Sequence, residues 1–121
     1  MQNRLLGKFT YMQTGSPFLQ LSRLTDVTRL IDHLARHKEF HRRSEPGLNR
    51  TLGPPASTPR WTTIVEEHPQ FFENLGDNYP LALRARIRAP GRAPLNNEEI
   101  ARLVADATRY AEDAHRTYRS G

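Results

Sequence analysis

The sequence of 121 residues contains no cysteine. Disulfide bonds, thiolate nucleophiles and cysteine zinc sites are therefore excluded. No apolar run approaches the length of about 18 residues that spans a bilayer. Residues 1–21 also lack the continuous apolar stretch and small-residue cleavage site of a secretion signal. We therefore expect a cytoplasmic protein that has no membrane partner.

Motifs for catalysis are absent as well. The sequence has no GxGxxG, GxxxxGK[ST], GxSxG or HExxH pattern, and so offers no phosphate-binding loop, nucleophile elbow or zinc-protease helix. One acid–histidine cluster occurs at Glu66-Glu67-His68, but His68 directly precedes Pro69, which is typical of a helix end. We expect neither enzyme activity nor a cofactor.

Lysine is scarce, since only Lys8 and Lys38 among the 18 basic residues are lysines. The net charge is +5 and the isoelectric point is near 10.2. Arginine and lysine displace the counterions around phosphates, so a basic chain favours nucleic acid as a partner. An arginine bias this strong is also produced by the base composition of a genome, so charge alone leaves the partner open.

A helix is expected to begin at Ser22, a residue type that often caps helices, with Asp26 in its first turn. Apolar residues at three- and four-residue spacing give it one buried face, formed by Leu24, Val27, Leu30, Ile31 and Leu34. The helix should reach at least His37 and at most Arg43, before Pro46 and Gly47 end it. Residues 1–21 are expected to be an arm or to hold a short strand near 8–12.

His33, His37 and His41 would share one face if the helix ran that far. They would span about 12 Å, which is too far for three ligands of one ion, so we expect no metal. The histidine at 41 lies instead in a second basic patch, formed by Arg36, Lys38, His41, Arg42 and Arg43.

The stretch 44–59 holds four prolines, and its Leu48 and Leu52 predict one buried helical turn stopped by Gly53 and Pro54. Thr58-Pro59 then starts a short helix, because proline is tolerated in the first turn. Its expected buried side chains, and the paired aromatics that follow them, are Trp61, Ile64, Val65, Phe71 and Phe72.

Residues 79–88 alternate between apolar and basic side chains, which predicts a half-buried strand paired in a hairpin with residues near 71–75. Arg84, Arg86 and Arg88 would then lie in a row about 6.6–6.8 Å apart, close to the phosphate spacing of nucleic acid. A solvated outer strand face is the alternative explanation.

The last element is a long helix from Glu98 to Arg119, preceded by Asn96 and Glu99 at capping-box spacing. At about 33 Å it is longer than a small domain covers, so we expect its outer half to pack on another copy. The residues expected in this oligomer contact are Leu103, Ala107, Tyr110, Ala111, Ala114 and Tyr118.

Together these elements predict a helix-rich α+β fold of winged helix-turn-helix type, with an arm (1–21), a winged-helix-like domain (22–92) and a C-terminal helix (93–121). Arg60, Thr62 and Thr63 would face DNA from the recognition helix, and Arg84, Arg86 and Arg88 from the wing. Acidic residues follow closely at 66, 67, 73 and 77, however, and would repel phosphates. Two functions therefore stay open: a regulatory DNA- or RNA-binding protein, or a protein-binding adaptor that oligomerises through its C-terminal helix.

Three short motifs also occur in this order: Leu24-Thr-Asp-Val27, Trp61-Thr-Thr-Ile-Val-Glu-Glu-His-Pro-Gln-Phe-Phe72 and Pro94-Leu-Asn-Asn-Glu-Glu-Ile100. In residues 22–118 the chain resembles a family of small bacterial proteins, many of them cyanobacterial. Members have a tryptophan helix, a His-Pro-x-Phe-Phe element, a leucine-rich strand and a long last helix. The resemblance implies this order of elements and a bacterial source. The chain departs from the pattern in its proline-rich stretch 44–59 and at Glu73, where an arginine is expected.

Overall fold

The computed structural model describes residues 15–120, so the strand expected near residues 8–12 lies outside the described part of the chain. The elements follow in the order η1 (Pro17–Leu19), α2 (Arg23–Arg36), β1 (Arg42–Arg43), α3 (Glu45–Leu52), α4 (Trp61–Glu67), β2 (Phe72–Asn74), β3 (Leu81–Leu83), α5 (Arg84–Arg88), η2 (Pro90–Arg92) and α6 (Asn97–Ser120). The three strands form one antiparallel sheet in the order β1-β3-β2. The predicted helix-rich α+β class is confirmed.

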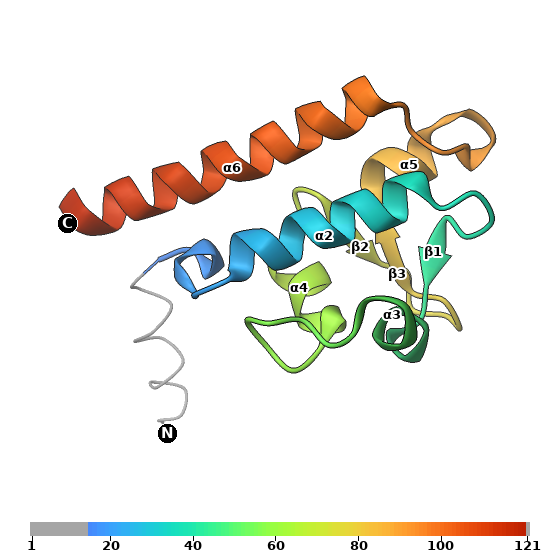
Figure 1. The fold of residues 1–121 in the computed structure, drawn as a ribbon, viewed down its shortest axis with the longest axis horizontal. Coiled ribbons are helices and arrows are strands. Elements are labelled where there is room, and N and C mark those ends of the chain that lie inside the picture. The colour runs from blue at the N-terminus through green and yellow to red at the C-terminus, as the bar shows by residue number, and fades with distance from the viewer. Residues whose placement is uncertain (1–14, 121) are drawn as a thin grey trace.

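Helix α2 lies at the centre of the fold (Figure 1). The long helix α6 runs antiparallel along one side of it, and the sheet, α3 and α4 lie on the other side. The predicted apolar face of α2 is buried, with Val27, Leu30, Ile31 and Leu34 fully inaccessible. Trp61 and the paired phenylalanines complete the core between α2 and the sheet, as the sequence predicts.

Both ends of α2 differ in detail from the prediction. Ser22 precedes the helix in a left-handed conformation (φ 69°), and its side chain makes no capping hydrogen bond. The helix ends at Arg36, one residue short of the predicted minimum. His37 Nδ1 accepts hydrogen bonds from the N–H groups of Glu39 and Phe40, both at 3.1 Å, and these bonds turn the chain toward β1. Because His41 follows this turn, it does not share a helical face with His33.

The proline-rich stretch contains more helix than expected. Pro46 and Gly47 do not terminate a helix but lie in the first turn of α3, where the missing proline N–H costs nothing. Ser44 Oγ caps this turn by accepting from the Gly47 N–H at 3.1 Å. Glu45, also in the first turn, accepts from the N–H groups of Trp61 and Thr62, both at 2.8 Å. One carboxylate of α3 therefore caps α4, which starts two residues after the predicted Thr58-Pro59 signal.

The predicted hairpin exists, but its second strand is much shorter than expected. β3 is the central strand and ends at Leu83, opposite Phe72, where β2 begins. Its three residues are all buried, so the alternation of residues 79–88 does not separate a core face from a solvent face. From Arg84 onward the chain has no strand to pair with, and it turns into the helix α5.

Helix α6 matches its prediction within one residue at each end. The capping box is confirmed, since the Asn96 N–H donates to Glu99 Oε1 at 2.9 Å and the Glu99 N–H donates to Asn96 Oδ1 at 2.8 Å. Over residues 15–120 no helix combines the length and apolar character needed to cross a bilayer.

Candidate functional site

The predicted row of wing arginines is wrong. Arg84, Arg86 and Arg88 lie in a helix, in which residues two apart differ by about 200° around the axis. Arg86 therefore points away from the other two, and only 2% of it is exposed. In the predicted strand the three guanidinium groups would have shared one face at the spacing of phosphates. Because these residues form a helix, the argument for phosphate binding from this spacing no longer holds.

Two of these arginines bind the chain itself. Arg84 Nε donates to the carbonyl oxygens of Pro69 at 2.6 Å and Phe72 at 3.1 Å, and its guanidinium lies 3.4 Å from the Glu73 carboxylate. Arg86 donates to the carbonyl oxygens of Leu34 and Arg92 at 2.9 and 2.8 Å, and burial lowers its pKa. Arg88 is exposed. The fold uses the first two arginines as hydrogen-bond donors to backbone carbonyls of the same chain.

The predicted recognition helix α4 also presents little to a DNA groove. Thr62 Oγ1 donates to Glu45 Oε1 at 2.7 Å, so this hydroxyl is engaged inside the protein. Arg60 is exposed and Thr63 is half-buried, but exposed Glu66 lies on the same short helix and accepts from Asn74 Nδ2 at 2.9 Å. The start of α5 lies beside the end of α4, because Arg84 Nε donates to the Pro69 carbonyl oxygen at 2.6 Å, but this arginine is engaged there within the protein.

A different surface brings aromatic and basic side chains together. An open hollow of 440 Å³ is lined by Phe40, His41, Arg42, Tyr79 and Arg92, and also by Glu39. We name the first five residues the aromatic–basic surface. Phe40 is 44% exposed and Tyr79 is 54% exposed. Three separate segments therefore contribute to one site: the α2–β1 loop with β1, the β2–β3 turn, and η2.

Local hydrogen bonds fix the backbone that carries both rings. The bonds from the backbone to His37 fix the turn that carries Phe40, and the His37 and Phe40 rings lie 4.8 Å apart. The Arg43 guanidinium lies 5.0 Å from the centre of the Phe40 ring, within cation–π range. In the β2–β3 turn the Tyr79 N–H donates to Asp77 Oδ1 at 3.0 Å. The backbone at both rings is thus fixed by contacts within the protein.

The charges around the hollow are mixed, with an excess of cations near His41. Arg92 Nη1 lies 3.4 Å from His41 Nε2, and Arg42 forms an ion pair with Asp77. Burial, and then the nearby Arg92, Arg42 and Arg86, lower the pKa of His41, which is therefore neutral near pH 7. Sequence reasoning placed His41 and Arg42 in a second basic patch. It missed Phe40, which directly precedes His41 in the sequence, and it missed Tyr79 and Arg92, which only the folded chain brings to that patch.

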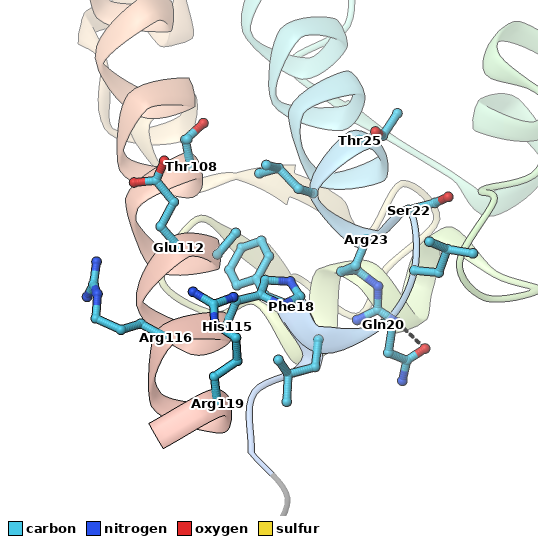
Figure 2. A pocket seen from close by; sticks show the side chains of 14 residues that line it. Phe18, Gln20, Ser22, Arg23, Thr25, Thr108, Glu112, His115, Arg116 and Arg119 are labelled. Atoms are coloured by element: carbon cyan, nitrogen blue, oxygen red, sulfur yellow. Dashed lines mark hydrogen bonds between the residues drawn. The ribbon is translucent and has the colours of Figure 1, made fainter. Parts of the chain in front are cut away.

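A second hollow lies between α6 and the start of α2 (Figure 2). This groove has a volume of 670 Å³ and is floored by Phe18 of η1, while His115 and Arg119 line its α6 side. Leu21 also lines it and is 89% exposed, the highest value among the large apolar residues described. The groove therefore offers an apolar contact beside basic side chains.

The residues predicted for oligomerisation divide into two groups. Ala107 and Ala111 are buried within the same chain, and Leu103 and Ala114 are partly buried against its core. Only Tyr110 and Tyr118 are well exposed, at 44% and 62%. Helix η1 packs against α6, which the sequence did not predict, but most residues from Arg109 to Arg119 remain exposed.

A buried polar network joins α2 to the loop before α4. Asp26 is fully buried and accepts from the N–H groups of Ala56 at 2.9 Å and Ser57 at 2.7 Å, and from Ser57 Oγ at 2.6 Å. Arg23, 1% exposed, donates to Ser57 Oγ at 2.8 Å and contacts His68 Nε2 at 3.3 Å. These contacts tie α2 to residues 56–57 and to His68, so we assign the four side chains a structural role. Among the described residues no hydrogen bond joins Ser57 to His68.

Within residues 15–120 no group of three histidine or acidic side chains is arranged to hold a metal ion. Comparison of the chain with protein-family models, with curated proteins and with solved structures gave no match. The resemblance to the small bacterial family therefore stays a prediction from three short motifs.

Proposed function

We propose that this protein is a non-enzymatic nucleic-acid-binding protein of winged-helix type, whose ligand contacts the aromatic–basic surface. The observation that carries the proposal is the hollow in which two exposed aromatic rings, Phe40 and Tyr79, lie beside two arginines, Arg42 and Arg92. Aromatic faces stack on bases and arginines hold phosphates, so this combination is typical of nucleic-acid sites.

The order of elements supports the winged-helix part of the proposal. A helix, a strand, two helices and a two-stranded hairpin follow one another as α2, β1, α3, α4, β2 and β3. The first strand pairs with the last, which gives the order β1-β3-β2 of a winged-helix sheet. The β2–β3 turn, residues 75–80, corresponds to the wing. Tyr79 lies in this wing, so the proposed ligand still contacts it, although at other residues than the predicted arginine row.

Binding of nucleic acid at low salt tests the proposal. Fluorescence anisotropy with labelled DNA and RNA should show a complex with the wild-type protein that weakens when Arg92→Gln and Arg42→Gln are combined. Arg102→Gln on α6 is the matched control, because Arg102 is exposed and lies outside the hollow. A wild-type protein that binds no nucleic acid at low salt would contradict the proposal.

A protein-binding adaptor is the second candidate, and the groove of Figure 2 favours it. Exposed Leu21 beside Phe18 is the kind of apolar contact that a partner helix or a second copy covers. Light scattering after gel filtration should then report an assembly that Leu21→Asp dissociates. A monomer at all concentrations, together with no bound protein partner, would exclude this function.

A further inference from the structure

We infer that the ligand is single-stranded nucleic acid whose unpaired bases stack on Phe40 and Tyr79, and that α4 does not enter the major groove of a duplex. The inference rests on the proposed function and names the form of nucleic acid that the aromatic–basic surface takes. Its basis is the exposure of the two rings and their place at one hollow.

The rings of Phe40 and Tyr79 can stack on unpaired bases but not on the bases inside a duplex. A base inside a double helix is already stacked on its neighbours, and its faces are closed to side chains. An unpaired base leaves both faces open, and every base can stack on an aromatic ring whatever its sequence. Phe40 and Tyr79 expose about half of their surface at one hollow, and the backbone N–H of each donates a local hydrogen bond. The protein thus keeps two apolar rings in water at a place where bases can reach them.

The small number of cations at the hollow favours a single strand of nucleic acid over a duplex. Of the two arginines that line it, Arg42 is paired with Asp77, and the carboxylate residue Glu39 also lines the hollow. This leaves Arg92 as the principal phosphate contact, with Arg42 released only if a phosphate replaces the Asp77 carboxylate. A site with so few phosphate contacts binds a duplex weakly, because duplex affinity depends on many of them. Stacking therefore has to supply most of the affinity.

The surface of helix α4 is poorly suited to contact with duplex DNA. In a winged-helix protein that reads DNA, this helix would lie in the major groove. Here Thr62 is engaged with Glu45, and Glu66 is exposed on the same helix. A carboxylate that faces the groove is repelled by the phosphates on both of its sides. The expected recognition surface is therefore poorly suited to a duplex.

The full chain is titrated against labelled single-stranded DNA and RNA of about 12 nucleotides, a length typical of small single-strand-binding domains, and against a blunt duplex of the same sequence. The single strands should bind at least about tenfold more tightly than the duplex. Phe40→Ala and Tyr79→Ala should each weaken single-strand binding at least about fivefold, as the loss of one stacked base does. Phe40→Tyr and Tyr79→Phe keep a ring and should retain binding.

Tyr118→Ala is the matched control, since this tyrosine is 62% exposed at the far end of α6 from the hollow. It should leave affinity unchanged. If the duplex binds as tightly as the single strands, or if the alanine variants bind like wild type, the single-strand inference is overturned while the proposed function stands. If no nucleic acid binds, both fail. Displacement of the single strand by polyglutamate at equal charge would also overturn the inference, because it would show that stacking is not required.

Discussion

Arg86 donates a hydrogen bond from its Nε to the main-chain carbonyl of Arg92 at 2.8 Å. The donor is buried and the acceptor belongs to an exposed residue, so an arginine in the interior fixes the backbone from which a surface arginine projects. The turn that carries Arg92 is unusual, because Gly91 and Arg92 both have positive φ, at 64° and 54°. Arg86 thus positions part of the aromatic–basic surface and does not itself contact the ligand.

Replacing Arg86 by methionine should lower the free energy of unfolding by about 3 kcal/mol, since the carbonyls of Leu34 and Arg92 both lose their donor. Arg88→Met is the control and should change stability by less than about 0.5 kcal/mol, because Arg88 is exposed. Urea unfolding followed by circular dichroism measures both. Equal effects at the two positions would show that Arg86 is not an interior residue.

The buried carboxylate of Asp26 predicts a second large effect. Asp26→Ala leaves three donors of Ala56 and Ser57 without their acceptor, so stability should fall by about 3 kcal/mol or more. Asp32→Ala removes only an exposed ion pair with Arg36 and should cost less than about 1 kcal/mol. The two thermal midpoints should differ clearly. A small effect at Asp26 would mean that the 56–57 loop is not anchored to α2.

Acid should destabilise the protein through His68. Burial, and then the nearby Arg23, lower the pKa of His68 from 6.5 to about 4 in the folded protein. Between pH 4 and pH 6.5 His68 is therefore mostly protonated in the unfolded chain and mostly neutral in the folded protein. The contribution of neutral His68 to the free energy of unfolding is therefore complete above pH 6.5. This contribution, up to about 3 kcal/mol, is lost as the pH falls toward 4.

His33 shifts in the same direction, to about 4, through burial and then Arg43 and His37, and adds to this loss. Urea unfolding at several pH values should show stability rising from pH 4.5 to about 6.5. His68→Gln, which does not titrate, should flatten this rise without removing the His33 part. Parallel curves for the variant and the wild type would contradict the pKa assigned to His68.

The salt dependence of binding gives a count of phosphate contacts. For single strands the logarithm of affinity falls with the logarithm of salt concentration by about 0.7 per neutralised phosphate. Arg92→Gln should therefore reduce this slope by about 0.7, and Arg102→Gln should leave it unchanged. Phe40→Ala should weaken binding at every salt concentration and keep the slope, because stacking releases no counterions. A reduced slope for Phe40→Ala would contradict a stacking role.

Much of the fold was predictable because its signals are local. The stripe from Val27 to Leu34, the buried Trp61 and the Asn96–Glu99 capping box are each set by residues within one or two helical turns of one another. The sequence did not show which strands pair or where the pairing ends. β1 is only two residues long and has no periodicity to detect, and β3 stops where its partner β2 begins, although the alternation continues to Arg88.

The candidate site was less predictable than the fold. His41 and Arg42 were identified by their charge, but Tyr79 was assigned to the buried face of a strand that does not extend so far. Its exposure depends on the turn at Asp77, and Asp77 is fixed in turn by Arg42 from β1, 35 residues away along the chain. Side chains that are brought together by such long-range contacts carry no signature in a local pattern.

Mapping the contact surface tests the central claim most directly. Amide chemical shifts of the labelled protein, recorded while a single-stranded oligonucleotide is added, should change most at residues 39–42, 77–79 and 91–92. Residues of α4 and the C-terminal half of α6 should change little. Shifts that concentrate on α4, or on the groove at Leu21 and His115, would place the ligand elsewhere and contradict the assignment of the aromatic–basic surface.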